Sequence, residues 1–110
     1  MNTPDTLQKL YTMAAASPLK EMCGLLTNDF EIIPIINVAQ SGQQFIMQKS
    51  GYFRALNKLK ESGQEIFAVY HSHPNNCVEA SQTDIESSRK TGLNYLIITP
   101  QGKYSWVEVN

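Results

Sequence analysis

The chain has two histidines, and both stand in one tripeptide, His71-Ser72-His73, at the end of the apolar run 66–70. In a β-strand, side chains two residues apart point to the same side of the sheet, so both imidazoles can reach one metal ion. Pro74 then stops the strand and leaves the histidines at the end of the sheet, where the next loop can close over a pocket. The spacing therefore predicts a metal site.

A carboxylate follows at a position from which it can join the histidines. Ser81 and Asp84 have the residue types and the spacing of a helix N-terminus, with Ser81 as N-cap. From the first turn of that helix, Asp84 can return an oxygen to the same ion as a third ligand. Two histidines and one carboxylate, with the fourth position left to water, are the ligand set of a catalytic zinc site.

Two other interpretations of these residues stay open. In one, Ser81 and Asp84 serve only to cap a helix, which would be preferred if the histidines were absent. In the other, Cys77 joins the three ligands in a closed structural zinc site. The open site is favoured over the closed one because Cys77 lies in a loop and no partner cysteine follows at zinc-knuckle spacing.

A hydrolytic metal site also needs a base that takes a proton from water and passes it to the leaving group. The candidates are the glutamates Glu21, Glu61, Glu65, Glu79 and Glu86. Glu21 is favoured because it directly precedes the buried apolar run "MCGLL", and a carboxylate at the mouth of a sheet is well placed to have a perturbed pKa. The other four are expected in a solvated turn, in the loop, or on a helix face that points elsewhere.

The remaining pattern predicts the elements that must position these residues. Apolar residues at helical spacing predict helices over residues 4–16, 50–61 and 81–92. Short apolar or β-branched runs predict strands over residues 22–27, 30–38, 45–48, 65–73, 93–99 and 104–109. The order α-β-β-β-α-β-α-β-β predicts one mixed β-sheet flanked by helices, in the α/β (α+β) class.

Several residues give these elements finer detail. Pro34 predicts an edge position or a bulge for the second strand. In the helix 50–61, Ser50 is expected as N-cap and Gly63 as the stop, and the residues expected to face inward are Phe53, Leu56 and Leu59. Alternation in the strand 65–73 places Ile66, Ala68 and Tyr70 on one face and Phe67, Val69, His71 and His73 on the other.

Composition places the chain among ordinary globular proteins. With 110 residues, of which 42% are hydrophobic and 17% charged, residues 1–110 are expected to form a single domain. The net charge of −1 and the lack of a basic run give no attraction to nucleic acid, and no apolar stretch is long enough to span a membrane. The N-terminal segment lacks the features of a secretory signal peptide, so Cys23 and Cys77 are expected to be reduced thiols in the cytoplasm.

The chain resembles the JAMM/MPN family of metalloproteases. That family carries an upstream glutamate and then the motif H-x-H-P-x(6)-S-x-x-D, which here runs from His71 to Asp84. The upstream segment "PLKEMCGLL", which begins at Pro18 and contains Glu21, is similar to the prokaryotic branch of the family. The resemblance extends from Pro18 to the last strand and implies the JAMM/MPN fold, which is cytidine-deaminase-like.

The resemblance also implies a role for each residue of the motif. His71, His73 and Asp84 would bind Zn²⁺, and a water would take the fourth position. Glu21 would be the general base and then the proton donor, and Ser81 would hydrogen-bond the oxyanion. This role for Ser81 argues against the N-cap interpretation, since one serine does not readily serve both.

The function implied is that of a zinc-dependent peptidase or isopeptidase that acts on a peptide or protein with a metal-activated water. A weaker similarity to lambda-type phage tail assembly proteins, in "NVA" and "YSW", implies a link to tail assembly or to cleavage of host cell-wall peptides. The partners would then be phage tail proteins or a cell-wall hydrolase chain, and the location the host cytoplasm or the virion tail.

Two alternatives accompany this interpretation. One is an enzyme that processes the C-terminal tail of a small ubiquitin-like or sulfur-carrier protein. The other is a non-catalytic tail or scaffold module that kept the fold. The presence of all five motif residues, Glu21, His71, His73, Ser81 and Asp84, argues against a non-catalytic module.

Overall fold

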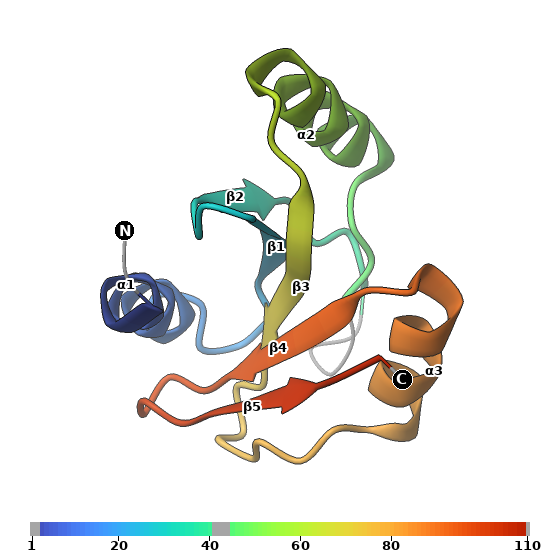
Figure 1. Cartoon of the computed structure of the whole chain (residues 1–110). Helices are drawn as coiled ribbons and strands as arrows, with labels where there is room; N and C mark the ends of the chain where they lie inside the picture. The colour runs from blue at the N-terminus through green and yellow to red at the C-terminus, as the bar shows by residue number, and fades with distance from the viewer. Residues whose placement is uncertain (1–2, 41–44, 110) are drawn as a thin grey trace.

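The computed structural model describes residues 3–40 and 45–109, which form one mixed sheet and its flanking helices (Figure 1). The helices are α1 (Thr3–Ala15), α2 (Lys49–Ser62) and α3 (Gln82–Thr91). The strands are β1 (Cys23–Thr27), β2 (Ile32–Ile35), β3 (Ile66–Ser72), β4 (Asn94–Ile98) and β5 (Tyr104–Val107). The strand order is β2-β1-β3-β4-β5, with β3 and β4 parallel and the other pairs antiparallel. The predicted mixed sheet of the α+β class is confirmed.

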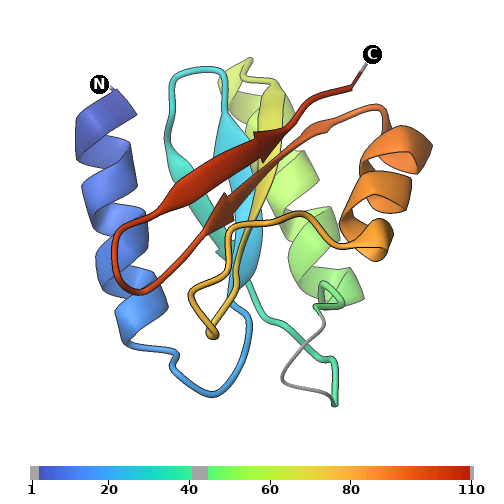
Figure 2. The same cartoon turned by 90° about the horizontal axis from the view of Figure 1, so that it is seen from below.

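The helices cover the two faces of the sheet, with α1 on one side and α2 and α3 on the other (Figure 2). On the α1 side, Leu10 packs in a buried cluster with Tyr70 of β3 and with residues of β1 and β4. On the opposite side, Leu59 of α2 packs in a second cluster with Val69 of β3. No helix within residues 3–40 and 45–109 combines the length and the apolar character needed to cross a membrane.

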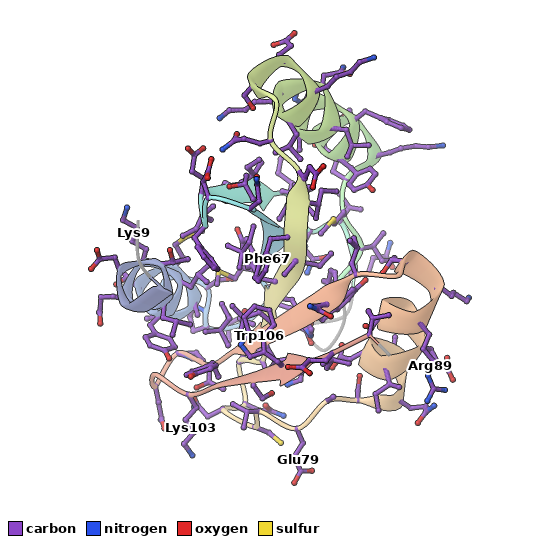
Figure 3. The ribbon with its side chains drawn as sticks, viewed as in Figure 1. Lys9, Phe67, Glu79, Arg89, Lys103 and Trp106 are labelled. Atoms are coloured by element: carbon purple, nitrogen blue, oxygen red, sulfur yellow. The ribbon has the colours of Figure 1, made fainter. Side chains whose placement is uncertain are left out.

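A β-bulge in β3 changes the expected faces of its first residues. Leu26 pairs with Ala68 but Thr27 pairs with Ile66, so Phe67 is the extra residue. Ile66 therefore packs on the same side as Val69, while Phe67 packs edge-on against Trp106 on the opposite side (Figure 3). The predicted alternation is wrong for Ile66 and Phe67 and holds from Ala68 onward.

Gly24 lies where the chain leaves no room for a side chain. It stands opposite Tyr70 in the β1–β3 pair, and a Cβ at Gly24 would lie 2.5 Å from the Tyr70 hydroxyl oxygen and would also clash with the Ile33 carbonyl. Tyr70 is fully buried, so its ring uses this space to complete the core on the α1 side. The glycine of the upstream motif is therefore required by packing.

Residues 30–48 contain several corrections to the predicted elements. Pro34 does lie on an edge strand, but β2 is shorter than the predicted 30–38 because Phe30 has a positive φ of 61° and belongs to the turn after β1. No strand forms over 45–48, where an isolated bridge pairs Met47 with Asn37. The loop expected after residue 38 lies largely outside the described residues.

The start of α2 also differs from the prediction. Gln48 is the N-cap in place of Ser50, and no side chain caps this end. The Gln48 N–H donates to the Ile36 carbonyl at 2.8 Å, and this bond fixes the point at which the chain enters the helix. Phe53 is 53% exposed because the inward side of the helix is set by Ala55 and Leu59, and a residue two positions before Ala55 points away. Gly63 ends the helix as predicted.

Candidate metal centre

Antiparallel pairing of β1 and β3 brings the upstream glutamate to the histidines. Cys23 pairs with His71, so two further residues in each direction place Glu21 opposite His73. The pairing continues past the strand ends: the Ser72 N–H donates to the Met22 carbonyl at 3.0 Å, and the Met22 N–H donates to the Ser72 hydroxyl at 2.9 Å. Glu21 is therefore held by the sheet register although it lies far from the histidines in sequence.

The two imidazoles face each other at the end of β3. His71 is fully buried, and His73 follows the strand with its N–H donating to the Ile98 carbonyl at 2.8 Å. Their Nε2 atoms are 3.2 Å apart. His73 Nδ1 lies 2.7 Å from the Cys77 carbonyl, an acceptor, so Nδ1 carries the proton and Nε2 presents its lone pair to the site.

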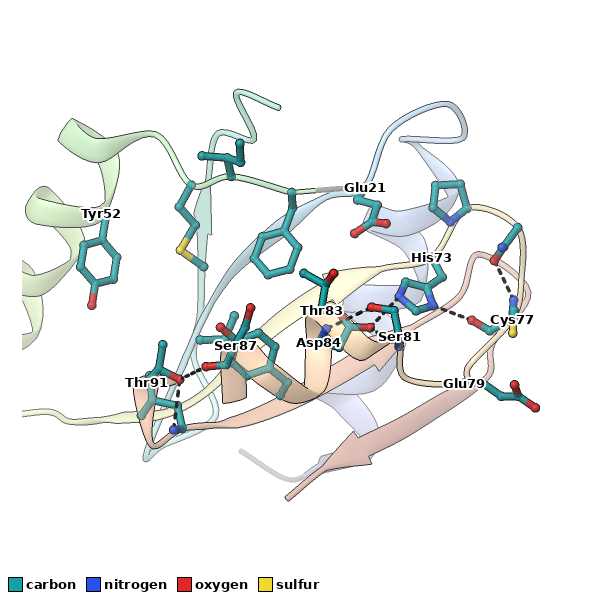
Figure 4. A pocket seen from close by; sticks show the side chains of 18 of the residues that line it. Glu21, Tyr52, His73, Cys77, Glu79, Ser81, Thr83, Asp84, Ser87 and Thr91 are labelled. Carbon is teal, nitrogen blue, oxygen red and sulfur yellow. Dashed lines mark hydrogen bonds and ion pairs between the residues drawn. The ribbon is translucent and has the colours of Figure 1, made fainter. Parts of the chain in front are cut away.

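Asp84 completes a set of three converging ligands. Its Oδ1 is 3.0 Å from His71 Nε2. Its Oδ2 is 3.3 Å from His73 Nε2, and Figure 4 shows these two residues side by side. Four ligand atoms around a zinc ion with bonds of about 2.0–2.1 Å are separated by roughly 3.3 Å at the edges of a tetrahedron. The Nε2–Nε2 separation of 3.2 Å is close to that edge length, as are the 3.0 and 3.3 Å from the histidines to the two different oxygens of Asp84. The imidazole and carboxylate donors also suit zinc.

Ser81 is the N-cap of α3, so the argument against that interpretation was wrong. Its hydroxyl accepts the Asp84 N–H at 3.0 Å, and Asp84 Oδ2 accepts the Ser81 N–H at 2.9 Å. This reciprocal capping box begins the helix and also fixes the Asp84 carboxylate where it meets the histidines. A hydroxyl that accepts in a cap still has its own proton to donate, so capping does not occupy Ser81 fully.

Glu21 lies at the same site, and 6% of its surface is exposed. One carboxylate oxygen of Glu21 and one ring nitrogen from each histidine all lie within 4.8 Å of one another. Burial raises the pKa of Glu21 to about 7, with Asp84 raising it and His73 lowering it. The other four candidate bases, Glu61, Glu65, Glu79 and Glu86, are exposed, as expected.

The charges at the site favour an ionised Asp84 beside a neutral His71. Burial raises the pKa of Asp84, but the hydrogen bonds with His71 and His73 lower it by more than burial raises it, so the net shift is downward. Burial lowers the pKa of His71 more than Asp84 raises it. For His73, burial lowers the pKa, but the bonds to Asp84 and to the Cys77 carbonyl leave it raised. The ionised Asp84 carboxylate therefore supplies negative charge beside the two imidazoles, which favours a cation there.

The two cysteines are free thiols, as predicted. Cys23 is buried, and its Sγ lies 3.4 Å from the Ile35 carbonyl. Cys77 is exposed and contacts His73 through its backbone carbonyl. In the described residues, the group of potential ligands within 4.8 Å of one another contains Glu21 and both histidines; Cys77 and Asp84 both lie outside it, but Asp84 contacts both imidazoles through its carboxylate, whereas no contact joins the Cys77 thiol to them. The closed structural site gains no support.

Two residues near the site were not anticipated. The Phe45 ring stacks on the His71 ring, with centroids 4.5 Å apart and an angle of 26° between the planes. His71 Nδ1 is buried without a hydrogen-bond partner among the described residues, so packing and the contacts of Nε2 hold this ring. Asn37 is a buried polar residue whose side chain bonds to the Glu21 carbonyl. The sequence signal at Phe45 was only that of a short apolar run.

A groove leads away from the metal centre (Figure 4). One wall carries hydroxyl groups at the start of and along α3, from Ser81, Thr83, Ser87 and Thr91. The other wall carries apolar side chains that are open to solvent: Leu19 is 88% exposed, Ile46 55% and Phe53 53%. Large apolar side chains left open beside a polar centre are typical of a binding surface.

Two imidazoles and one carboxylate at the end of a mixed sheet, with a second carboxylate from the first turn of α3, define a candidate metal centre in an α+β fold. The model of prokaryotic homologues of the JAB domain matches residues 3–109, and the chain belongs to that family. A desampylase from Haloferax volcanii is 30% identical over 97 residues, which cover 82% of this chain and 70% of that protein.

Solved structures agree with the fold. The solution structure of a protein from Desulfitobacterium hafniense has a TM-score of 0.76 and 26% identity, covering 93% of this chain and 77% of that one. The crystal structure of a JAB1/MPN domain protein from Archaeoglobus fulgidus has a TM-score of 0.51 and 17% identity, covering 94% and 89%. The fold implied by the resemblance to JAMM/MPN proteins is confirmed.

Proposed function

We propose that this protein is a zinc-dependent isopeptidase that cleaves the bond made by the C-terminal tail of a small ubiquitin-like or sulfur-carrier protein. The observation that carries the proposal is the convergence of His71, His73 and Asp84 at separations of 3.0–3.3 Å, with the buried carboxylate of Glu21 beside them. The substrate class rests on the similarity to the protein from Haloferax volcanii that is named desampylase.

The proposed roles follow from the positions of the side chains. His71 and His73 would hold the ion through Nε2, and Asp84 would hold it through a carboxylate oxygen. When bound, zinc would act as a Lewis acid on the scissile carbonyl and lower the pKa of a water. The Cys77 carbonyl keeps the His73 ring in the tautomer that this role needs.

Glu21 would move the protons of the reaction. A carboxyl with a pKa of about 7 can accept a proton from the attacking water and return it to the leaving amine at neutral pH. Ser81 would donate its hydroxyl proton to the carbonyl oxygen of the scissile bond, where negative charge develops. Its N-cap bond leaves that proton available because the hydroxyl accepts in the cap.

The groove suits an extended polypeptide tail. Leu19, Ile46 and Phe53 offer apolar contacts on one wall, and the hydroxyls of α3 offer hydrogen bonds to a backbone on the other. No observation favours phage tail proteins or cell-wall peptides in the same way. The convergence of all the motif residues also argues against a non-catalytic module.

The test is cleavage of a defined isopeptide substrate. The zinc-loaded protein is incubated with a small ubiquitin-like protein whose C-terminal carboxylate is joined to a lysine of a second protein, and the products are measured by mass spectrometry. We expect release of the ubiquitin-like protein with its C-terminal tail intact, and no release after chelation of zinc. A peptidoglycan stem peptide is the comparison substrate, and cleavage of that peptide alone would contradict the proposed substrate class.

A further inference from the structure

Asn37 joins three backbone segments through one buried side chain. It is 9% exposed, and its Nδ2 donates to the Glu21 carbonyl at 2.7 Å. Its Oδ1 accepts the N–H of Ala39 at 2.9 Å and the N–H of Ile46 at 3.0 Å. A buried amide with both ends bonded fixes the distance between the groups that it connects, because breaking either bond leaves a buried polar group unpaired.

Two of the segments that Asn37 connects, those of Glu21 and Ile46, lead to the metal centre. The Glu21 carbonyl belongs to the residue whose carboxylate lies beside the histidines. Ile46 directly follows Phe45, whose ring stacks on His71 at 4.5 Å. Asn37 therefore bonds to the backbone of the proposed proton carrier on one side and to the support of a proposed metal ligand on the other.

The register of the sheet brings Glu21 to the histidines, but the bonds of the sheet stop one residue short of it. Regular pairing begins at Cys23, and the last bonds of the β1–β3 edge involve Met22 and Ser72. The bond from Asn37 anchors the next carbonyl beyond that point. Since a shift of about 1 Å in a reacting group can cost on the order of 10²-fold in rate, the anchor controls a sensitive distance.

We propose that Asn37 is a positioning residue that sets the place of Glu21 relative to the two histidines. The inference rests on the proposed function, in which Glu21 transfers protons. In this proposal Asn37 acts through the backbone of Glu21 and through the segment that carries Phe45.

The experiment compares Asn37→Asp with Thr27→Val. Aspartate keeps the shape and the oxygen that accepts from Ala39 and Ile46 but has no N–H for the Glu21 carbonyl. Thr27 is the matched control: it is fully buried at the other end of β1, and its hydroxyl accepts the N–H groups of Asp29 and Glu31. Both variants lose buried hydrogen bonds, but only Asn37→Asp loses the bond to the Glu21 carbonyl.

We expect Asn37→Asp to lower kcat roughly 10-fold or more while KM and the zinc content stay unchanged. Thr27→Val should lower the urea midpoint of unfolding and leave kcat unchanged. Equal kcat values for wild type and folded, zinc-loaded Asn37→Asp would overturn the inference. So would a loss of kcat in Thr27→Val of the same size, because Asn37 would then act only through stability.

Two further measurements separate the possible failures. If Glu21→Gln is fully active, the proposed function fails; if Glu21→Gln is inactive while Asn37→Asp is active, only the present inference fails. Should Asn37→Asp not fold, side-chain amide exchange in the wild type decides. Asn37 Nδ2 protons that exchange many times more slowly than those of the exposed Asn57 support the anchor, and equal exchange rates overturn it.

Discussion

The carboxylate of Asp84 has partners of two kinds. Oδ2 accepts the Ser81 N–H at 2.9 Å in the capping box of α3, and the two oxygens lie 3.0 and 3.3 Å from the histidine Nε2 atoms. The start of the helix and the orientation of a ligand are thus set by the same pair of residues. A substitution of Ser81 or Asp84 consequently affects stability and chemistry together, and the two effects have to be measured separately.

Glu21→Gln tests proton transfer without removing the side chain. Glutamine keeps the size of the glutamate but does not accept a proton at neutral pH. We expect normal folding, retained zinc, and a fall in kcat of roughly 10²–10⁴-fold, measured on the isopeptide substrate with zinc determined by mass spectrometry. Loss of zinc in this variant would instead indicate that Glu21 is a ligand, a role that its position within 4.8 Å of both histidines permits.

Ser81→Ala separates the cap from the oxyanion contact when it is compared with Ser81→Thr. Alanine removes the acceptor for the Asp84 N–H and should lower the free energy of unfolding by about 1 kcal/mol. It should also lower kcat on the order of 10²-fold, because the proposed donor to the carbonyl oxygen is gone. Threonine keeps the hydroxyl and should restore both quantities in large part. Restored stability without restored kcat would argue against the oxyanion role.

At the scale of elements, the β1–β3 register determines which upstream residue reaches the histidines. Cys23 pairs with His71, and Gly24 pairs with Tyr70. A shift of one residue would turn Glu21 to the other face and place Met22 opposite His73. The close fit of Gly24 against Tyr70 excludes such a shift, since any larger residue there would meet the tyrosine ring.

Gly24→Ala tests this fit. The added methyl group would lie 2.5 Å from the Tyr70 hydroxyl oxygen, so strand or ring must move, and we expect a loss of roughly 1–3 kcal/mol in the free energy of unfolding. Gly51→Ala in α2 is the matched control. Its nearest neighbour is the flexible Gln48 side chain at 3.3 Å, and alanine in a helix should be neutral or stabilise by up to about 1 kcal/mol. Equal stability of the two variants, measured by urea unfolding, would contradict the packing argument.

The residues predictable from sequence were those whose spacing follows the period of a single element. His71 and His73 share a strand face, and Ser81 and Asp84 share a helix start, so local rules place each pair. Local rules did not place Phe45 and Asn37, because their partners, His71 and Glu21, lie in other segments. The bulge at Phe67 left no sequence signal either, since one extra residue in a strand changes no local preference.

At the scale of the molecule, ion binding and stability are linked. An ion that binds only the folded chain stabilises it by about 2.7 kcal/mol at a concentration 100 times its Kd. For a domain of 110 residues this raises Tm by on the order of 10 °C. We expect this rise when zinc is added to chelator-treated protein, measured by calorimetry. His71→Ala should show no comparable rise in Tm. An equal rise in that variant would indicate that the ion binds at another site.

The order of the elements and the mixed sheet could also be predicted from sequence, because most strands are short apolar runs bounded by turns. The strand expected over 45–48 failed because that segment makes a single bridge, at Met47, instead of joining the sheet. Its backbone bonds go to Asn37 and its neighbours, such as the bond from the Val38 N–H to the Ile46 carbonyl at 2.8 Å. Hydrophobicity alone does not distinguish a sheet strand from an extended segment that packs over a site.

The distance of Glu21 from the other site residues along the chain has a consequence for how the proposed activity would be lost. His71 to Asp84 is one stretch of 14 residues, closed by one short loop, whereas Glu21 lies 50 residues before His71. Closing the short loop costs little chain entropy, while bringing Glu21 into place requires two distant strands to pair. Ion binding and the proposed catalytic turnover would therefore depend on different parts of the chain and could be lost separately. A change before β1 that displaces Glu21 would abolish the proposed activity and leave the proposed metal ligands in place.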